Sequence, residues 1–112
     1  MPKTMTNFHP SEEVAGELID GLITDRVLNF DKDTANVTRM QTYAPGWKAG
    51  AHSHDYWEEV LVLKGRIFDE TLNRWVEPGE YACRPPGQVH GPMEAGPEGA
   101  TVLLINTSSW GK

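Results

Sequence analysis

The sequence predicts an all-β fold, either a sandwich or a barrel, and two observations lead to this prediction. The apolar residues of the 112-residue chain fall in short bursts rather than in a helical period. Turn residues separate the bursts, and most of the eleven glycines and eight prolines stand at these joints. Many short strands with regular turn signals are typical of β-sandwiches and barrels.

The expected elements follow from these bursts in chain order. A helix is expected only over residues 11–19, because Ser11 is a favourable N-cap and two glutamates follow it in the first turn. We expect one domain, in which residues 1–30 form an arm that packs on a barrel of residues 31–112. The chain is expected to form strands over residues 22–28, 36–43, 58–63, 66–69, 80–84 and 101–106.

Composition and charge narrow the class of protein. A hydrophobic content of 38% and a charged content of 23% indicate an ordinary globular chain. The net charge of −6 argues against nucleic acid and against an anionic membrane surface as partners. No segment approaches the roughly 20 apolar residues of a membrane span, and the N-terminus lacks the apolar stretch of a secretory signal. We therefore expect a cytoplasmic protein with a small-molecule substrate or ligand.

Three of the four histidines stand in a pattern typical of a metal site. His52 and His54 are two residues apart, Glu58 follows four residues later, and His90 follows a Pro-Pro-Gly turn. Fully extended chain from His52 to Glu58 would cover roughly 20 Å, so a bend is expected within residues 55–57. Three neutral imidazoles and one carboxylate predict one divalent transition ion: Fe, Mn, Ni or Zn. Glu59 is the competing carboxylate, and opposite strand parity favours Glu58.

The spacing of these residues resembles the two sequence motifs of the cupin superfamily. The first motif places His-x-His and Glu between two glycines, as in residues 46–65. The second motif places Pro-x-Gly and His between Gly and Asn, as in residues 79–94, where Glu94 replaces the asparagine. The resemblance implies a cupin jelly roll, also called a double-stranded β-helix, with a short N-terminal arm. It also implies a metal ion held by His52, His54, Glu58 and His90.

A closer resemblance is to the cupins related to the C-terminal domain of the anti-sigma factor ChrR and to acetylacetone-cleaving dioxygenases. It rests on residues 52–63, 68–70 and 84–87, together with His90 and Pro92. It implies an oxidoreductase, namely a dioxygenase that acts on a small chelating substrate such as a diketone or enol. Alternatives are a lyase or isomerase with a redox-inert ion, a non-catalytic sensor module that binds a metal or ligand, and a sugar-processing cupin.

Three further residues are candidates for the wall of a pocket beside the ion. Glu80 and Arg84 are expected to face water, which by strand alternation turns Tyr81 and Cys83 inward. Packing in the core is the alternative for both of these side chains. Trp57 lies in the expected bend, where it either lines the metal cleft or packs the loop.

The strand expected at residues 58–63 also has an apolar outer side. If Glu58, Val60 and Val62 line the barrel, Leu61 and Leu63 lie on its outer face. These leucines need cover from the N-terminal segment or from a second subunit. Because cupin barrels commonly pair through their sheets, the resemblance implies a homodimer.

Overall fold

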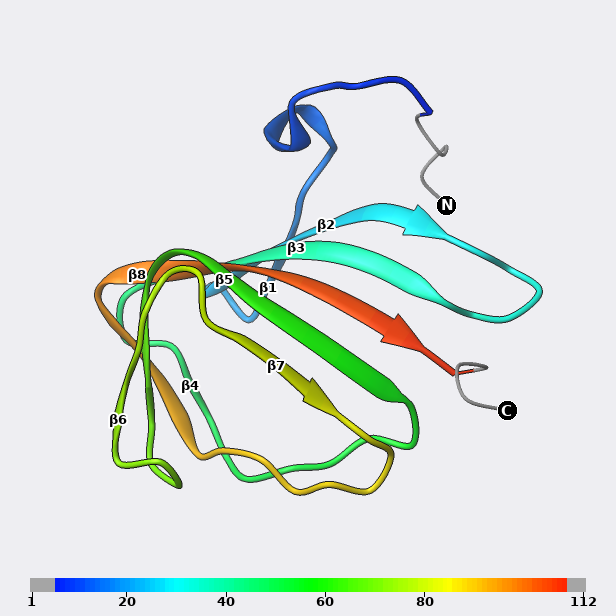
Figure 1. Ribbon diagram of the computed structural model, residues 1–112. Coiled ribbons are helices and arrows are strands. Elements are labelled where there is room, and N and C mark those ends of the chain that lie inside the picture. The colour runs from blue at the N-terminus through cyan, green and yellow to red at the C-terminus, as the bar shows by residue number, and fades with distance from the viewer. Residues whose placement is uncertain (1–5, 109–112) are drawn as a thin grey trace.

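The computed structural model describes residues 6–108, which form an open barrel of antiparallel strands (Figure 1). The strands follow the order β1-β2-β3-β8-β5-β6, with β4 on β8 and β7 on β5. This arrangement confirms the predicted all-β jelly roll. The elements are the 3-10 turn η1 (Ser11–Glu13) and the strands β1 (Glu17–Ile19), β2 (Ile23–Phe30), β3 (Val37–Tyr43), β4 (Lys48–Ala49), β5 (Trp57–Asp69), β6 (Arg74–Val76), β7 (Tyr81–Arg84) and β8 (Met93–Thr107).

Strands β5 and β8 form the long, curved spine of the barrel (Figure 1). The strands expected at residues 58–63 and 66–69 are therefore one strand, whose register shifts around Lys64 and Gly65. Gly65 and Gly99 have φ angles of 66° and 75° where the two strands bend past each other. A Cβ on Gly65 would collide with the carbonyl oxygen of Gly99, and one on Gly99 with that of Tyr43. Glycine is thus required at both positions, by backbone conformation and by space.

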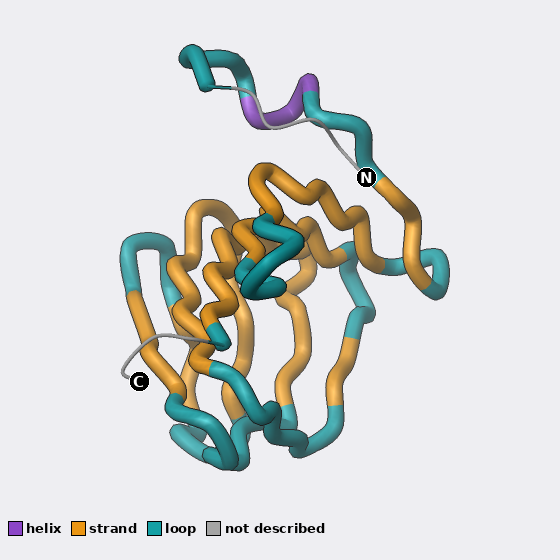
Figure 2. Tube along the Cα trace, turned by 90° about the vertical axis from the view of Figure 1, so that its right-hand side faces the viewer, coloured by secondary structure: helices purple, strands orange, loops and turns teal. Residues whose placement is uncertain are grey.

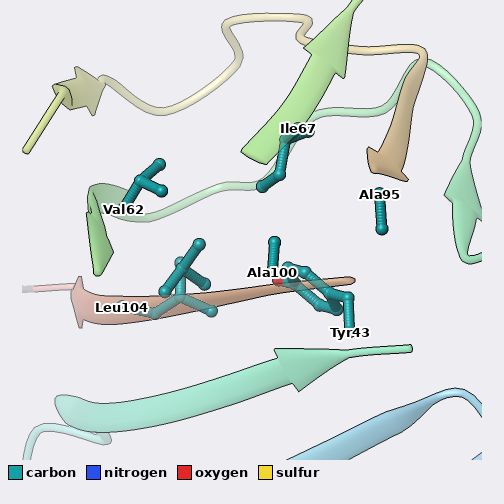
Figure 3. Packing of buried hydrophobic residues seen from close by; sticks show 7 residues of the cluster. Tyr43, Val62, Ile67, Ala95, Ala100 and Leu104 are labelled. Carbon is teal, nitrogen blue, oxygen red and sulfur yellow. The ribbon is translucent and has the colours of Figure 1, made fainter. Parts of the chain in front are cut away.

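The hydrophobic core lies between the two layers of the barrel. Figure 3 shows side chains from both layers pointing toward the space between them. Val102 and Val62, with exposures of 1% and 2%, are its most buried members. Glu58 lies four residues before Val62 on the same face of β5. The barrel interior therefore changes along β5 from an apolar core at Val62 to a polar region at Glu58. The buried cluster comprises Tyr43, Val62, Ile67, Ala95, Ala100, Val102 and Leu104.

The prediction of a helix over residues 11–19 is wrong. Only η1 forms, because Val14 is extended and residues 17–19 pair with β2 instead. Strands β1 and β2 fall within the expected arm, yet β2 pairs with β3 along its whole length and continues the sheet. The turn η1 lies above the strands (Figure 2), where the Ser11 hydroxyl contacts the Met40 sulfur at 3.5 Å. Residues 1–5 and 109–112 of the expected arm and barrel lie outside the described part.

The outer face of the sheet carries an apolar row at the predicted place. The pairing register puts Met40, Leu103, Leu61 and Tyr81 side by side across β3, β8, β5 and β7. The N-terminal turn contacts Met40 through Ser11 and Lys64 on β5 through Glu12, but Leu63 is still 40% exposed. An uncovered strip of this kind is a common feature of subunit interfaces.

Candidate metal centre

Two loops bring the three histidines together. His52 and His54 lie between β4 and β5, and His90 lies between β7 and β8. The loops run side by side at the lower edge of Figure 1. The amide of His52 donates to the carbonyl of His90 at 2.9 Å, and the reverse bond measures 2.8 Å. A third bond, from Gly87 N–H to the His54 carbonyl, measures 2.7 Å. One ligand nitrogen from each ring lies within 4.8 Å of the others.

Backbone carbonyls set the protonation of two of these rings. Nδ1 of His52 lies 2.7 Å from the Gly50 carbonyl oxygen, and Nδ1 of His90 lies 3.2 Å from that of Gln88. Because a carbonyl can only accept, each Nδ1 must carry a hydrogen, and in the neutral ring the lone pair is then on Nε2. Metal-binding histidines are commonly oriented by such a bond. The donors of this cluster therefore fit a metal ion.

The electrostatic environment of His90 also favours a neutral ring. The residue is only 6% exposed, and burial is the main cause that lowers the pKa of its imidazole. The positive charge of the nearby Arg84 lowers the pKa further. A histidine must be neutral to bind a metal, so this environment keeps a ligand nitrogen available at mildly acidic pH.

Glu58 lies against the histidines and is almost completely buried. It is the second residue of β5, directly after a bend at residues 55–56. Its Oε2 lies 3.3 Å from Nε2 of His54, and its Oε1 lies 3.6 Å from Nε2 of His90. Arg84 donates from Nη1 to Oε1 at 3.1 Å. The neighbouring Glu59 points to the other face, where it accepts a bond from the Tyr81 hydroxyl.

Two further side chains neighbour the site: Tyr56, which was not identified from the sequence, and Arg84, for which a solvated strand face was favoured over binding of an anionic substrate. Arg84 was expected to face water, but its side chain is 14% exposed and its register partner on β5 is Glu58. Tyr56 stacks on His54 with ring centroids 4.7 Å apart and planes 16° apart. Burial, followed by the charge of Glu58, raises the pKa of the Tyr56 hydroxyl. Tyr56 therefore stays protonated beside the cluster at neutral pH.

The expected inward orientation of Tyr81 and Cys83 is wrong. Strand alternation turns Arg84 inward to meet Glu58, which places Tyr81 and Cys83 on the outer face. Tyr81 borders the cavity described below, but its side chain is 57% exposed. Within residues 6–108, the residues that border this cavity include neither Cys83 nor Trp57. Trp57 begins β5 with the parity opposite to that of Glu58, and it pairs with Thr107.

A cavity of about 380 Å³ opens beside the histidine cluster. This volume is in the range of small-molecule sites. Its apolar wall consists of side chains on the inner faces of β5 and β8, among them Val60, Val62 and Leu104. Its polar residues include Arg39, Gln41, Tyr43 and Asn106. A ligand that fills this cavity would have an apolar wall on one side and hydrogen-bonding groups on the other.

The polar wall is held by a chain of hydrogen bonds. Tyr43 donates to Gln41 at 2.8 Å, and Gln41 donates to Asp25 at 3.0 Å. Arg39 reaches the second oxygen of Asp25 at 3.3 Å. Burial is the main cause that raises the pKa of the Tyr43 hydroxyl, and the charge of Glu58 adds to it. The Asp25 carboxylate therefore holds both Arg39 and Gln41 at the cavity wall. Asp25 itself is only 6% exposed.

We expect Asp25→Asn to lower the free energy of unfolding by about 1–2 kcal/mol. The substitution removes the negative charge of Asp25 and so weakens the hydrogen bonds that Arg39 and Gln41 donate to this side chain. Equilibrium denaturation with urea measures this change. Glu17→Gln is the matched control, since Glu17 is exposed and is paired in register with Asp25 on the neighbouring strand. Equal small effects of the two substitutions would show that the chain of hydrogen bonds does not stabilise the fold.

Among the residues that the structure describes, no helix is long and apolar enough to cross a membrane. No curated protein matches the sequence. Several solved structures are similar to this chain. Because their sequence identities are low, the similarity supports only the fold.

An acetylacetone dioxygenase from Acinetobacter johnsonii has a TM-score of 0.73 at 15% identity, over 96% of this chain and 77% of that one. The polyketide cyclase RemF from Streptomyces resistomycificus has a TM-score of 0.74 at 22% identity, over 94% and 81%. The Rhodobacter sphaeroides complex of SigE with the anti-sigma ChrR has a TM-score of 0.70 at 21% identity, over 85% and 50%. The family model of the ChrR cupin-like domain matches residues 10–109, so the chain belongs to the ChrR cupin-like family.

Proposed function

We propose that this protein is a metal-dependent enzyme that acts on a small chelating substrate. One divalent transition ion, Fe, Mn, Ni or Zn, would be held by His52, His54, Glu58 and His90. The observation that carries the proposal is the convergence of three imidazole nitrogens next to a cavity of about 380 Å³. A metal site that opens on a cavity leaves coordination positions for a substrate, as catalytic sites require.

We propose a diketone-like or enol-like substrate and a dioxygenase reaction. The structural similarity to an acetylacetone dioxygenase supports this choice. When bound, such an ion supplies Lewis acidity and, if it is iron, a means of activating O₂. Lyase or isomerase chemistry with a redox-inert ion is the alternative for the same ligands.

The chain's own residues would orient the substrate and exclude water. Val60, Val62 and Leu104 form an apolar wall, and Gln41 lies on the polar wall. Tyr56 covers one face of the His54 ring and keeps it in place. We assign no general base, because Tyr43 and Tyr56 both have raised pKa values and stay protonated at neutral pH.

Metal analysis of protein purified without added metal, followed by oxygen-consumption measurements with acetylacetone, tests this proposal. We expect about one equivalent of Fe, Mn or Ni, with oxygen uptake in the iron form. Absence of any metal, even after reconstitution, would refute a metal enzyme. One equivalent of metal without turnover of any diketone or enol would refute the dioxygenase assignment alone.

A second candidate is a non-catalytic sensor module, which the ChrR family membership favours. In that case the barrel would hold Zn or a small ligand and would report to a protein partner. A tetrahedral Zn with all four positions taken by the protein would favour the sensor, whereas bound water beside the cavity would favour the enzyme. X-ray absorption spectroscopy of the metal-loaded protein distinguishes these two coordinations. A cytoplasmic location stays a prediction.

A homodimer is also part of the proposal. The turn η1 contacts Met40 and Lys64 beside the row of Met40, Leu103, Leu61 and Tyr81, but Leu63 and Tyr81 stay exposed and need cover. We expect sedimentation velocity to give twice the mass of one chain, and Leu63→Glu to shift the protein toward monomer. Leu72→Glu is the matched control, because Leu72 is 55% exposed and lies in the turn between β5 and β6. A wild-type monomer would mean that the arm alone covers the row.

A further inference from the structure

Arg84 occupies an unusual place for a positive charge. It projects into the interior at the edge of a histidine cluster that would attract a cation, and its side chain is 14% exposed. A positive charge beside a cation site lowers the affinity of that site for a cation, so Arg84 should have another role there. Within residues 6–108 it pairs with Glu58, the carboxylate that contacts the cluster. The Glu58 carboxylate therefore contacts both the Arg84 guanidinium and the histidines.

The other two arginines on the cavity wall have acidic partners of their own. Arg39 pairs with the buried Asp25, and Arg74 pairs with Glu80 through two bonds of 3.0 and 2.8 Å. The Asp69 carboxylate accepts bonds from the amides of Thr71 and Leu72, away from the histidines. Among the described residues, Glu58 is the carboxylate that forms ion pairs both with the histidines and with Arg84.

The net charge at the centre follows from these contacts. The three histidines are neutral when they bind a metal, and Arg84 cancels the charge of Glu58. A divalent ion at this site would therefore keep more of its positive charge than it would beside an unpaired Glu58. Such a centre attracts an anion to its open side, and the guanidinium beside it adds to that attraction.

We propose that Arg84 is a specificity-determining residue that makes the metal centre select anionic ligands. It does so in two ways, by cancelling the charge of Glu58 and by adding a positive charge at the cavity wall. Bonding to Oε1 also leaves Oε2 as the oxygen free to approach the ion. This inference deepens the proposed function and rests on it, because it requires a metal ion on the histidines.

The test measures two affinities that Arg84 should shift in opposite directions. Co(II) binding is followed by competition with a chelating dye, and azide binding to the Co(II)-loaded protein by visible absorption. We expect Arg84→Met to bind Co(II) about tenfold more tightly and azide about tenfold more weakly than the wild type. Imidazole, a neutral ligand for the same open position, should bind with little change. A residue with a purely structural role would instead weaken the binding of Co(II) and of both ligands.

Three further variants complete the test. Arg84→Lys keeps the charge and should restore both affinities to within about threefold of the wild type. Arg84→Gln keeps a donor for Glu58 but removes the charge, so it should weaken azide binding as Arg84→Met does. Arg74→Gln is the matched control, because Arg74 borders the same cavity and is already paired with Glu80. Its azide affinity should stay within about twofold of the wild-type value.

The possible failures are distinguishable. No Co(II) binding by the wild type would refute the proposed metal function, and this inference with it. Normal Co(II) binding with unchanged azide affinity in Arg84→Met and Arg84→Gln would refute only the role of Arg84. If both neutral variants fail to fold while Arg84→Lys folds, Arg84 is a structural residue and the inference is wrong.

Discussion

His54→Ala is expected to lower metal affinity by at least about 100-fold. Loss of residues that merely support ligands already costs 10–100-fold, so loss of a ligand should cost at least as much. The His54 ring is fixed by stacking on Tyr56 and lies 3.3 Å from Glu58, so no other side chain can take its place without moving the loop. Competition with a chelating dye, together with metal analysis of the purified variant, measures the effect.

His9→Ala is the control for this experiment. His9 is the one histidine outside the cluster, and its Nδ1 lies 2.7 Å from the carbonyl oxygen of Asn7 in the N-terminal segment. We expect the metal content of this variant to equal that of the wild type. If His54→Ala retained wild-type affinity, the three-histidine cluster would not be the metal site, and the proposed function would fail with it.

Gly65→Ala is expected to destabilise the fold by about 3 kcal/mol or more, which lowers the melting temperature by more than about 10 °C. The new Cβ would collide with the backbone of Gly99 and Ala100, which cannot move without separating β5 from β8. The residue also has a φ of 66°, which alanine adopts only with strain. Calorimetry or thermal denaturation followed by circular dichroism gives the measurement.

Gly79→Ala separates the two causes. Gly79 has a φ of 90°, but a Cβ there would have open space around it. This variant should therefore show only the backbone strain, about 1 kcal/mol. If Gly65→Ala were no more destabilising than Gly79→Ala, the crowding between β5 and β8 would not be what requires glycine at the bend.

The fold class could be predicted from the sequence because turn residues separate the short apolar bursts that form the strands. Strand β3 was expected over residues 36–43 and extends from Val37 to Tyr43. The last strand was instead expected to begin only at residue 101, because two glycines and a proline within residues 95–99 are typical of a turn. These residues belong to β8, whose pairing with β5 continues at Ala95 and at Ala100 on either side of a register shift. Strands of two or three residues, such as β4 and β6, are too short to show any alternation.

The candidate site could be predicted only in part, for a similar reason. His52, His54 and His90 were identified by spacing and residue type, and the structure brings them together. The roles of Arg84 and Tyr56 depend on which residue of another segment faces them. Arg84 was placed in water on the assumption that a charged side chain avoids the interior. Its partner, Glu58, lies 26 positions away in the sequence, and no local pattern in the sequence indicates that pairing.

The cavity beside the histidines has a consequence for heat resistance. The barrel encloses about 380 Å³ that side chains do not fill, so its folded state lacks the packing that a filled interior would provide. An occupant that binds only the folded chain adds about 4 kcal/mol of stability when present at 1,000 times its dissociation constant. Thermal shift screening of metal ions and small anions therefore ranks candidate occupants without any assumption about the reaction.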